Sequence, residues 1–132
     1  MSQANVEVVR QAFDAFNERD VERLVSLSDP DCAWLPFRAQ LEGITYRGHD
    51  GVRRFVADMD EDWTEFRVEP REFREAGDQV VAIGRVTGRG SGTGVDIESD
   101  GGFVFGVRGG RITHIKSYSD PRAALESVGL DT

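Results

Sequence analysis

The chain has 132 residues, of which 24 are acidic and 16 basic, and its formal net charge is -8. This length fits one domain spanning residues 1–132, and the negative charge argues against nucleic acid or an anionic membrane surface as a partner. No run of 18 apolar residues occurs, and the first residues form neither a positive nor an apolar segment, so we expect a cytoplasmic protein. The single cysteine, Cys32, has no internal disulfide partner, and its apolar neighbours favour a small buried residue over a nucleophile.

Helical periodicity occupies the first part of the chain. Val6, Val9, Phe13 and Phe16 recur at helical spacing. A second short helix is predicted after Asp20, whose side chain is suited to the N-cap position. Two short helices therefore open the fold.

A short strand, a loop and a third helix are predicted next. Asp29-Pro30-Asp31 is expected to end the second helix, residues 32–37 form a short strand, and residues 38–48 form a loop. The third helix presents one apolar face, made of Val52, Phe55, Val56, Met59 and Trp63.

Beyond Trp63 the apolar period changes from helical to extended. Phe66 and Val68 alternate with charged residues until Pro70, and a proline at that point is typical of an edge strand or a bulged one. Further strands are predicted over 80–89, 95–107 and 111–118, and a short helix from Asp120-Pro121 to the neighbourhood of Gly129. Helices followed by hairpin-linked strands indicate the α+β class, with helices on one face of a curved, mostly antiparallel sheet.

Four stretches carry a resemblance to a known family. They are Val-Arg-Gln-Ala-Phe-Asp-Ala-Phe-Asn at 9–17, Tyr-Arg-Gly-His-Asp-Gly-Val-Arg at 46–53, Gly-Arg-Ile-Thr-His-Ile at 110–115 and Tyr-Ser-Asp-Pro at 118–121. With them, nearly the whole chain resembles the nuclear-transport-factor-like (NTF2-like), ketosteroid isomerase-like superfamily, and within it the SnoaL-like, polyketide cyclase-like proteins. The resemblance implies a cystatin-like, half-open cone of sheet closed by three N-terminal helices, a pocket between them, and a homodimer formed through the outer face of the sheet.

The resemblance also implies where an isomerase would carry its catalytic groups. That chemistry uses a carboxylate base, a tyrosine and a neutral carboxylic acid. The corresponding positions hold Leu35 at the end of the first strand, Phe13 and Phe16 on the first helix, and Gly101 on the long strand. Ketosteroid isomerase chemistry with these groups is therefore not expected, and other polar side chains become the candidates.

Arg85 and Glu98 are the first pair of candidates. Regular alternation would leave Glu98 on the outer face, but a bulge at Gly101-Gly102 would turn it inward. Arg85 stands among apolar residues and needs a carboxylate partner such as Glu98 or Asp96. The pair is either a water-orienting couple in the pocket or a structural ion pair on the sheet surface.

His114 and Asp120 are the remaining catalytic candidates. His114 is a possible pocket acid or base. Asp120 is suited to cap the last helix, and its place at a strand end makes it a candidate pocket base as well. The two histidines, His49 and His114, are far apart in sequence, so we expect no metal site and no cofactor.

Aromatic and large apolar side chains are predicted to line the pocket, although each also suits a plain core position. They are Phe13, Phe16, Trp34, Leu35, Phe37, Tyr46, Phe55, Met59, Trp63, Phe105, Ile115 and Tyr118. The sequence thus predicts a pocket for a small apolar molecule. Three functions stay open: a cofactor-free isomerase, cyclase or hydrolase acting on an apolar carbonyl or polyketide-like compound, a non-catalytic binder, and a dimerisation or accessory module.

Overall fold

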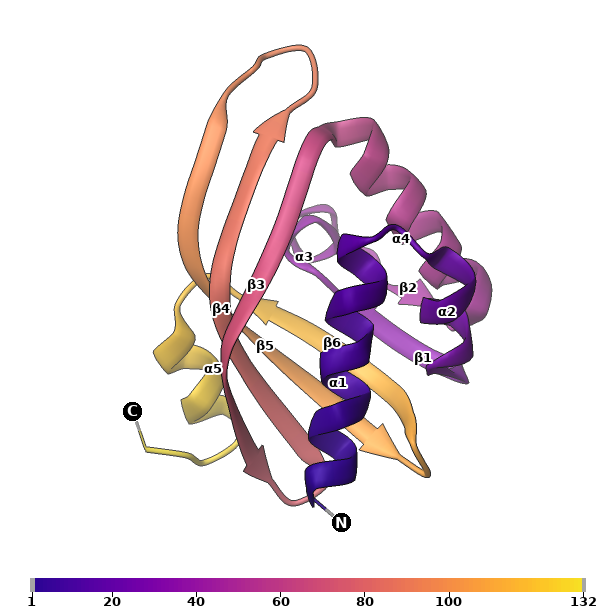
Figure 1. Ribbon diagram of the computed structural model, residues 1–132, viewed down its shortest axis with the longest axis vertical. Coiled ribbons are helices and arrows are strands. Elements are labelled where there is room, and N and C mark those ends of the chain that lie inside the picture. The colour runs from indigo at the N-terminus through magenta and orange to yellow at the C-terminus, as the bar shows by residue number, and fades with distance from the viewer. Residues whose placement is uncertain (1, 132) are drawn as a thin grey trace.

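The computed structural model describes residues 2–131, without the side chains of Ser2 and Arg38. Within this part of the chain the protein has five helices and six strands, whose arrangement Figure 1 shows. In order they are α1 (Ser2–Asn17), α2 (Val21–Ser26), β1 (Ser28–Leu35), α3 (Phe37–Glu42), β2 (Tyr46–Arg47), α4 (Gly48–Asp62), β3 (Trp63–Ala76), β4 (Gln79–Gly90), β5 (Asp96–Arg108), β6 (Arg111–Tyr118) and α5 (Pro121–Ser127). No helix in residues 2–131 is long and apolar enough to cross a membrane.

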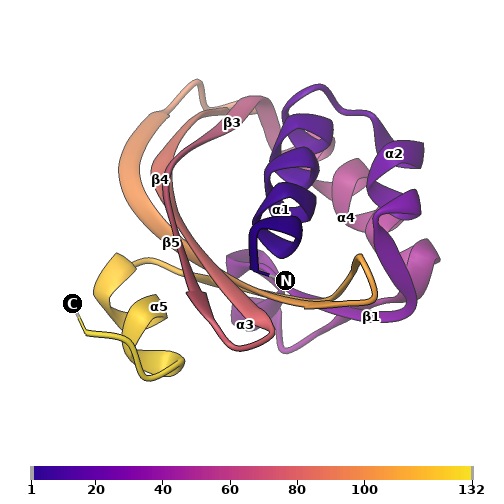
Figure 2. The same cartoon turned by 60° about the horizontal axis from the view of Figure 1, so that its bottom comes forward.

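The six strands form one curved sheet in the order β2-β1-β6-β5-β4-β3. β1 and β6 run parallel, and the other neighbours are antiparallel. Figure 2 shows β3, β4 and β5 curving around α1, with α5 on the opposite, convex side. The α+β class and the half-open, mostly antiparallel sheet predicted from the sequence are therefore confirmed.

Strand alternation separates the two faces of the sheet. On β4, Val80 and Ala82 pack in the large core with α1 and α4, whereas Val81 packs with Ala124 and Leu125 of α5. Because successive side chains of a strand point to opposite faces, this alternation defines an inner, concave face and an outer, convex face. Residues of β3 and β5 that pair directly with a β4 residue point to the same face as that residue.

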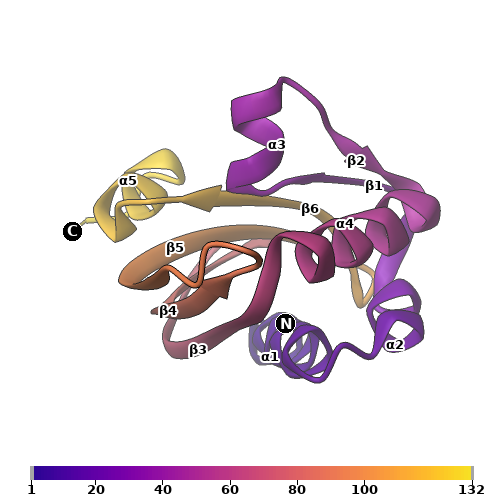
Figure 3. The ribbon, with the colours of Figure 1, turned by 90° about the horizontal axis from the view of Figure 1, so that it is seen from above.

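The segment predicted as a loop contains two further elements. α3 follows Pro36 and ends at Gly43, which adopts a left-handed conformation with φ 69°. β2 then pairs with β1. α3 has only six residues and no side-chain N-cap, so it carries neither a readable period nor a start signal. Figure 3 shows α3 beside the end of β1, away from α1 and α2.

Two boundaries also differ from the prediction. β1 begins at Ser28, before the Asp29-Pro30-Asp31 sequence, because its first residues already pair with β6. Trp63 was expected on the third helix, but it is the first residue of β3. A proline is tolerated where a strand is irregular, and the β1–β6 register shifts between Ser28 and Ala33.

Pro70 lies where the sequence analysis placed it, on an edge strand with a bulge. β3 is the last strand of the sheet, and its register against β4 shifts between Pro70 and Glu72. Gly84 faces this irregular backbone. A Cβ atom on Gly84 would lie 2.5 Å from the carbonyl oxygen of Glu69 and 2.9 Å from Cα of Pro70. Only a glycine fits between the two strands there.

Replacing Gly84 with alanine should therefore destabilise the fold. The added methyl group meets backbone atoms rather than a flexible side chain, so we expect a loss of about 1–3 kcal/mol in the free energy of unfolding. Urea denaturation followed by circular dichroism measures this loss. Thr87→Ala, on the outer face of the same strand, should change stability by less than about 0.5 kcal/mol. Equal stability of Gly84→Ala and the wild type would contradict the close approach.

Cys32 is part of the core below the cavity. Its side chain is fully buried, and burial raises the pKa of its thiol. Because the thiolate is the reactive form, a raised pKa and the lack of access both suppress its chemistry. Cys32 is the small buried residue that its apolar neighbours predicted.

The thiol of Cys32 should therefore be unreactive in the folded protein. At pH 8 we expect labelling by Ellman's reagent to proceed only as fast as the protein opens, and to be rapid in 6 M guanidinium chloride, the usual strong denaturant. Absorbance at 412 nm, the wavelength of the released thiolate product of this reagent, follows both reactions. Rapid labelling without denaturant would show that Cys32 is accessible.

Candidate functional site

A cavity of about 950 Å³ lies between the concave face of the sheet and the helices. Its inner wall combines Phe13 and Phe16 of α1, Trp34 of β1, Phe55 of α4 and Phe105 of β5. The helices present these side chains because they occupy the inward stripe of each amphipathic helix. The strands present their side chains to the cavity because these residues occupy the alternate positions that face the concave side of the sheet.

The aromatic rings of this wall contact one another. Phe13 makes edge contacts with Phe103 and Phe105, at centroid distances of 5.5 and 5.3 Å. Phe16 stacks on Phe55 at 5.8 Å. Such pairs hold ring positions more firmly than isolated aliphatic contacts do. The inner cavity is therefore a preformed apolar surface.

Polar side chains gather at the mouth, near α3, the end of α4 and the β4–β5 turn. The polar residues that border the cavity are Glu42, Asp62, Ser91, Thr93, Glu98, Ser99, Asp100, Ser117, Tyr118 and Ser119. No lysine, arginine or histidine is among the lining residues whose side chains the structure describes. The site thus combines an aromatic interior with a mouth of carboxylates and hydroxyl groups.

All but two of the residues predicted to line the pocket border this cavity. They are Phe13, Phe16, Trp34, Phe37, Phe55, Met59, Trp63, Phe105, Ile115 and Tyr118. The ring of Tyr118 packs with the outer apolar cluster around α5, so this residue contributes only to the mouth. Phe37 is 48% exposed there.

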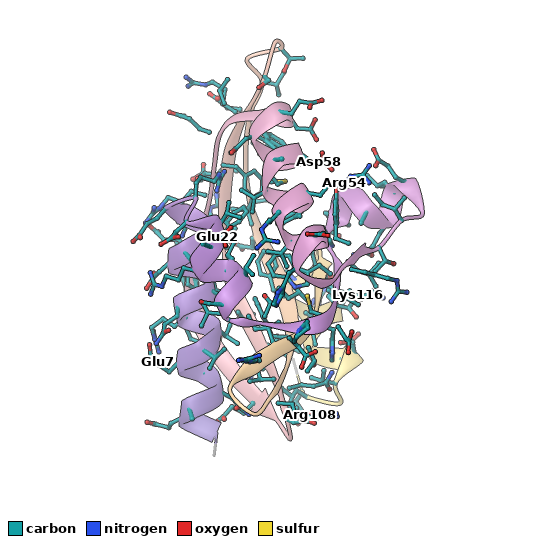
Figure 4. All side chains as sticks on the ribbon, turned by 90° about the vertical axis from the view of Figure 1, so that its right-hand side faces the viewer. Glu7, Glu22, Arg54, Asp58, Arg108 and Lys116 are labelled. Carbon is teal, nitrogen blue, oxygen red and sulfur yellow. The ribbon has the colours of Figure 1, made fainter. Side chains whose placement is uncertain are left out.

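Leu35 and Tyr46 do not line the cavity. Leu35 follows the inward Trp34 on β1 and therefore belongs to the other face. Tyr46 is 3% exposed, and its hydroxyl donates to Asp58 Oδ2 at 2.6 Å. Figure 4 shows Asp58 beside Arg54 on α4, and Arg54 Nε lies 4.0 Å from the same Asp58 oxygen. Tyr46 joins β2 to α4 and offers its hydroxyl to no ligand.

Arg85 and Glu98 lie on the outer face of the sheet. β4 and β5 pair without interruption from Gln79 opposite Gly106 to Arg89 opposite Asp96, so the considered bulge at Gly101-Gly102 is absent from this pairing. Glu98 therefore keeps its outward parity.

The outward carboxylates pair with Arg85. Arg85 Nη1 donates to Asp100 Oδ1 at 3.1 Å, and Arg85 Nε lies 3.5 Å from Glu98 Oε2. The hydrogen bond to Asp100, with help from Glu98, raises the pKa of Arg85. Glu98 and Asp100 border the cavity mouth, but Arg85 does not line the cavity. The arrangement is a surface ion-pair network.

His114 also lies outside the cavity. The β5–β6 register shifts between Gly106 and Val107, and His114 pairs with Gly106 on the outer face. Its Nε2 lies 3.3 Å from Gln79 Nε2, and its Nδ1 lies 3.3 Å from Thr113 Oγ1. On β5 the register shift lies next to His114 rather than at Gly101-Gly102.

Asp120 caps α5. Its Oδ1 accepts a hydrogen bond from the backbone N–H of Arg122 at 2.9 Å, and Asp120 does not line the cavity. Within the described residues, no group of three or more His, Cys, Asp or Glu side chains is arranged to hold a metal ion. None of the four predicted catalytic residues belongs to the inner wall of the cavity: only Glu98 borders it, and it does so from the outer face of the sheet.

Several lining residues were not singled out from the sequence. Phe66, Val86 and Phe103 join the wall from three neighbouring strands. Their positions were readable in principle, because Phe103 shares strand parity with Phe105, and Val86 follows the parity of Val80 and Ala82.

The indole Nε1 of Trp34 is the one buried side-chain nitrogen or oxygen atom without a hydrogen-bond partner in the described part of the chain.

Comparisons with known proteins agree with this architecture. The SnoaL-like domain family matches residues 9–115. TerC, crystallised with polyporic acid, is 28% identical over 95% of this chain and 97% of its own, with a TM-score of 0.78. An NTF2-like protein from Burkholderia xenovorans LB400 is 28% identical over 96% of this chain and 97% of its own, with a TM-score of 0.75.

A more distant structure shares the fold. A protein from Jannaschia sp. CCS1, named as a SnoaL-like polyketide cyclase, is 18% identical over 98% of this chain and 94% of its own, with a TM-score of 0.76. No functionally curated protein matches the chain. Since the family match extends over most of the sequence, this chain belongs to the SnoaL-like domain family of the NTF2-like superfamily.

Proposed function

We propose that this protein binds a small, apolar, ring-containing molecule in the cavity between the helices and the concave face of the sheet. The observation that carries the proposal is the aromatic interior of a cavity of about 950 Å³. Ligand pockets generally fall in the range of roughly 300–1,000 Å³, so this one suits a ligand with several rings. Flat rings fit because the wall itself is built of ring edges and faces.

The charge of the site supports a neutral ligand over an anionic one. Described lining side chains include carboxylates of Glu42 and Asp62 but no basic group, and the chain as a whole has a net charge of -8. An anion would lose hydration without gaining a cationic partner. Hydroxyl donors that border the cavity, such as Ser117 on the inner face of β6, suit an uncharged polar group on the ligand.

The relationship to TerC supports the ring-containing part of this proposal. TerC has been crystallised with polyporic acid, and this chain is 28% identical to it over nearly its full length. At that identity the shared fold makes polyporic acid a probe of both ring binding and charge, because it has several rings and its acidic hydroxyl groups make it an anion at neutral pH. The identity of the natural ligand is a separate question that a compound screen addresses.

Binding without proton transfer is the function that the cavity favours over an isomerase, cyclase or hydrolase. A proton-transfer enzyme needs an acid or base within hydrogen-bond reach of the ligand. Arg85, His114 and Asp120 do not line the cavity, and the Glu98 carboxylate lies beside Arg85 on the outer face. The inner wall offers a ligand rings, aliphatic carbons and the indole N–H of Trp34, which is neither a general acid nor a base.

Binding of N-phenyl-1-naphthylamine tests the proposal, because this neutral dye fluoresces in apolar surroundings. We expect a saturable increase with one site per chain. Ile115→Trp adds bulk to the inner wall and should weaken the dye's Kd by about tenfold or more, as overpacking costs roughly 1–3 kcal/mol. Polyporic acid should compete only weakly with the dye at neutral pH, because the site offers its negative charge no basic partner. Thermal unfolding of each variant checks that the fold is retained.

Matched controls come from the outer face. His114→Asn changes the strand residue next to Ile115, and Arg85→Met removes the centre of the surface ion pairs. Both should bind the dye as the wild type does. If the neutral dye does not bind the wild type, the proposal fails. If His114→Asn or Arg85→Met abolishes binding in a folded protein, the site is not the cavity.

The homodimer implied by the family resemblance stays a prediction. α5 covers the outer face at Val81 and Val104, so a partner would meet the remaining part, which carries Arg85 and its carboxylates. Sedimentation equilibrium measures the mass in solution directly. A dimer that weakens strongly at high salt would agree with contact through these charges. A monomer at all concentrations would contradict the prediction.

A further inference from the structure

The turn between α1 and α2 holds a residue in an unfavourable backbone conformation. Arg19 has φ 56°, and it is the one non-glycine residue with positive φ in the described part of the chain. The backbone N–H of Asp20 donates to Ala15 O at 2.8 Å, and that of Arg19 donates to Phe16 O at 3.0 Å. These two bonds form a Schellman motif that ends α1, with Arg19 at the position where glycine is usual.

An arginine at this position needs an explanation from its side chain. A left-handed conformation costs a residue with a Cβ atom free energy that glycine does not lose. Backbone strain of this kind persists where the surrounding structure gains from the residue. The contacts of the guanidinium group show what that gain is.

The guanidinium group of Arg19 bonds to three different elements. Its Nη1 donates to Phe16 O of α1 at 2.6 Å, its Nε to Asp60 Oδ1 of α4 at 2.9 Å, and its Nη2 to Phe66 O of β3 at 3.1 Å. It also lies over the Phe16 ring, 4.4 Å from the centroid. The planar fork of arginine satisfies three such acceptors at once, whereas the ammonium of lysine is a single point.

The neighbouring Asn17 strengthens the same junction. Its side chain donates to Val68 O at 2.7 Å and accepts from Val68 N at 3.0 Å, so it pairs with the edge strand β3 as another strand would. Phe16, Phe66 and Val68 all line the cavity. Asn17 and Arg19 thus fasten the C-terminal end of α1 to the wall of the cavity.

We propose that Arg19 is a positioning residue of the ligand site: it fixes the spacing of α1, α4 and β3 and the orientation of the Phe16 ring. The inference rests on the proposed function, since it concerns the same cavity. Arg19 touches no ligand itself, because it does not line the cavity. It acts through Phe16 and Phe66, and it keeps the cavity preorganised so that a ligand need not order its walls on binding.

Glycine and lysine at position 19 separate this role from plain stabilisation. Arg19→Gly removes the three hydrogen bonds but also relieves the backbone strain, so the relief should offset part of the stability that is lost with the bonds. Its affinity for N-phenyl-1-naphthylamine should nevertheless fall by about tenfold, since the cavity walls are no longer preorganised. Arg19→Lys keeps the charge and the strain but lacks the fork, so it should lose both stability and affinity.

The dependence of affinity on ligand size distinguishes the two roles, because a residue that only stabilises the fold would leave the ratio of the Kd values for a small and a large dye unchanged. We expect the wild type to discriminate between N-phenyl-1-naphthylamine and the larger dye Nile red, and the ratio of their Kd values to shift toward one in Arg19→Gly. Arg23→Gln is the matched control, because Arg23 pairs with Glu18 at the surface and does not line the cavity. This variant should keep both Kd values.

Hydrogen exchange tests the inference without any ligand. In the ligand-free protein, amide exchange at residues 66–68 and in the last turn of α1 should be faster in Arg19→Gly than in the wild type and in Arg23→Gln. If the wild type binds the dyes and Arg19→Gly has unchanged Kd values, size ratio and exchange, the inference is overturned while the proposed function stands. If the wild type binds neither dye, the proposed function fails, and exchange alone decides whether Arg19 fixes the walls.

Discussion

The unbroken pairing of β4 with β5 is the constraint on which the rest of the structure depends. Eleven consecutive residue pairs join the two strands, from Gln79 with Gly106 to Arg89 with Asp96. Since side chains alternate along both strands, this register assigns every residue of the central sheet to one face. The inner face receives Val80, Phe103 and Phe105, and the outer face receives the charged residues. The apolar cavity and the surface ion pairs follow from the same alternation.

This constraint explains which parts of the fold were predictable. The helices of Phe13 and Phe55 and the strands from Phe66 onward have periods long enough to read, so the α+β class and most lining residues follow from the sequence. α3 was not predictable because six residues show no period and Pro36 offers no side-chain cap. Register decided the rest: whether Gly101-Gly102 forms a bulge depends on pairing across strands, which residue types alone do not specify.

The candidate catalytic residues show the same limit. Arg85 was expected to meet Glu98 or Asp96, because a guanidinium among apolar residues needs a carboxylate; it lies 3.5 Å from Glu98, but its hydrogen bond goes to Asp100. Their pairing by itself did not reveal the face on which they meet. Asp120 was assigned to both a cap and a base, and its hydrogen bond to Arg122 N fills the capping role. Charge and sequence spacing predicted which residues would pair. Which residues line the cavity depends instead on the face of the sheet to which each strand residue points.

Arg19 shows how a cavity of this size is compatible with a stable fold. An unfilled apolar cavity loses the packing contacts that a filled core would have, so its walls need support from outside. Asn17 and Arg19 supply that support with hydrogen bonds to Val68, Phe66 and Asp60 from behind the apolar wall. Polar bonds placed there leave the interior largely apolar, with the indole N–H of Trp34 as a buried donor without a partner in the described part of the chain. A site built in this way holds its shape through its outer layer, while its inner surface selects ligands by size and by lack of charge.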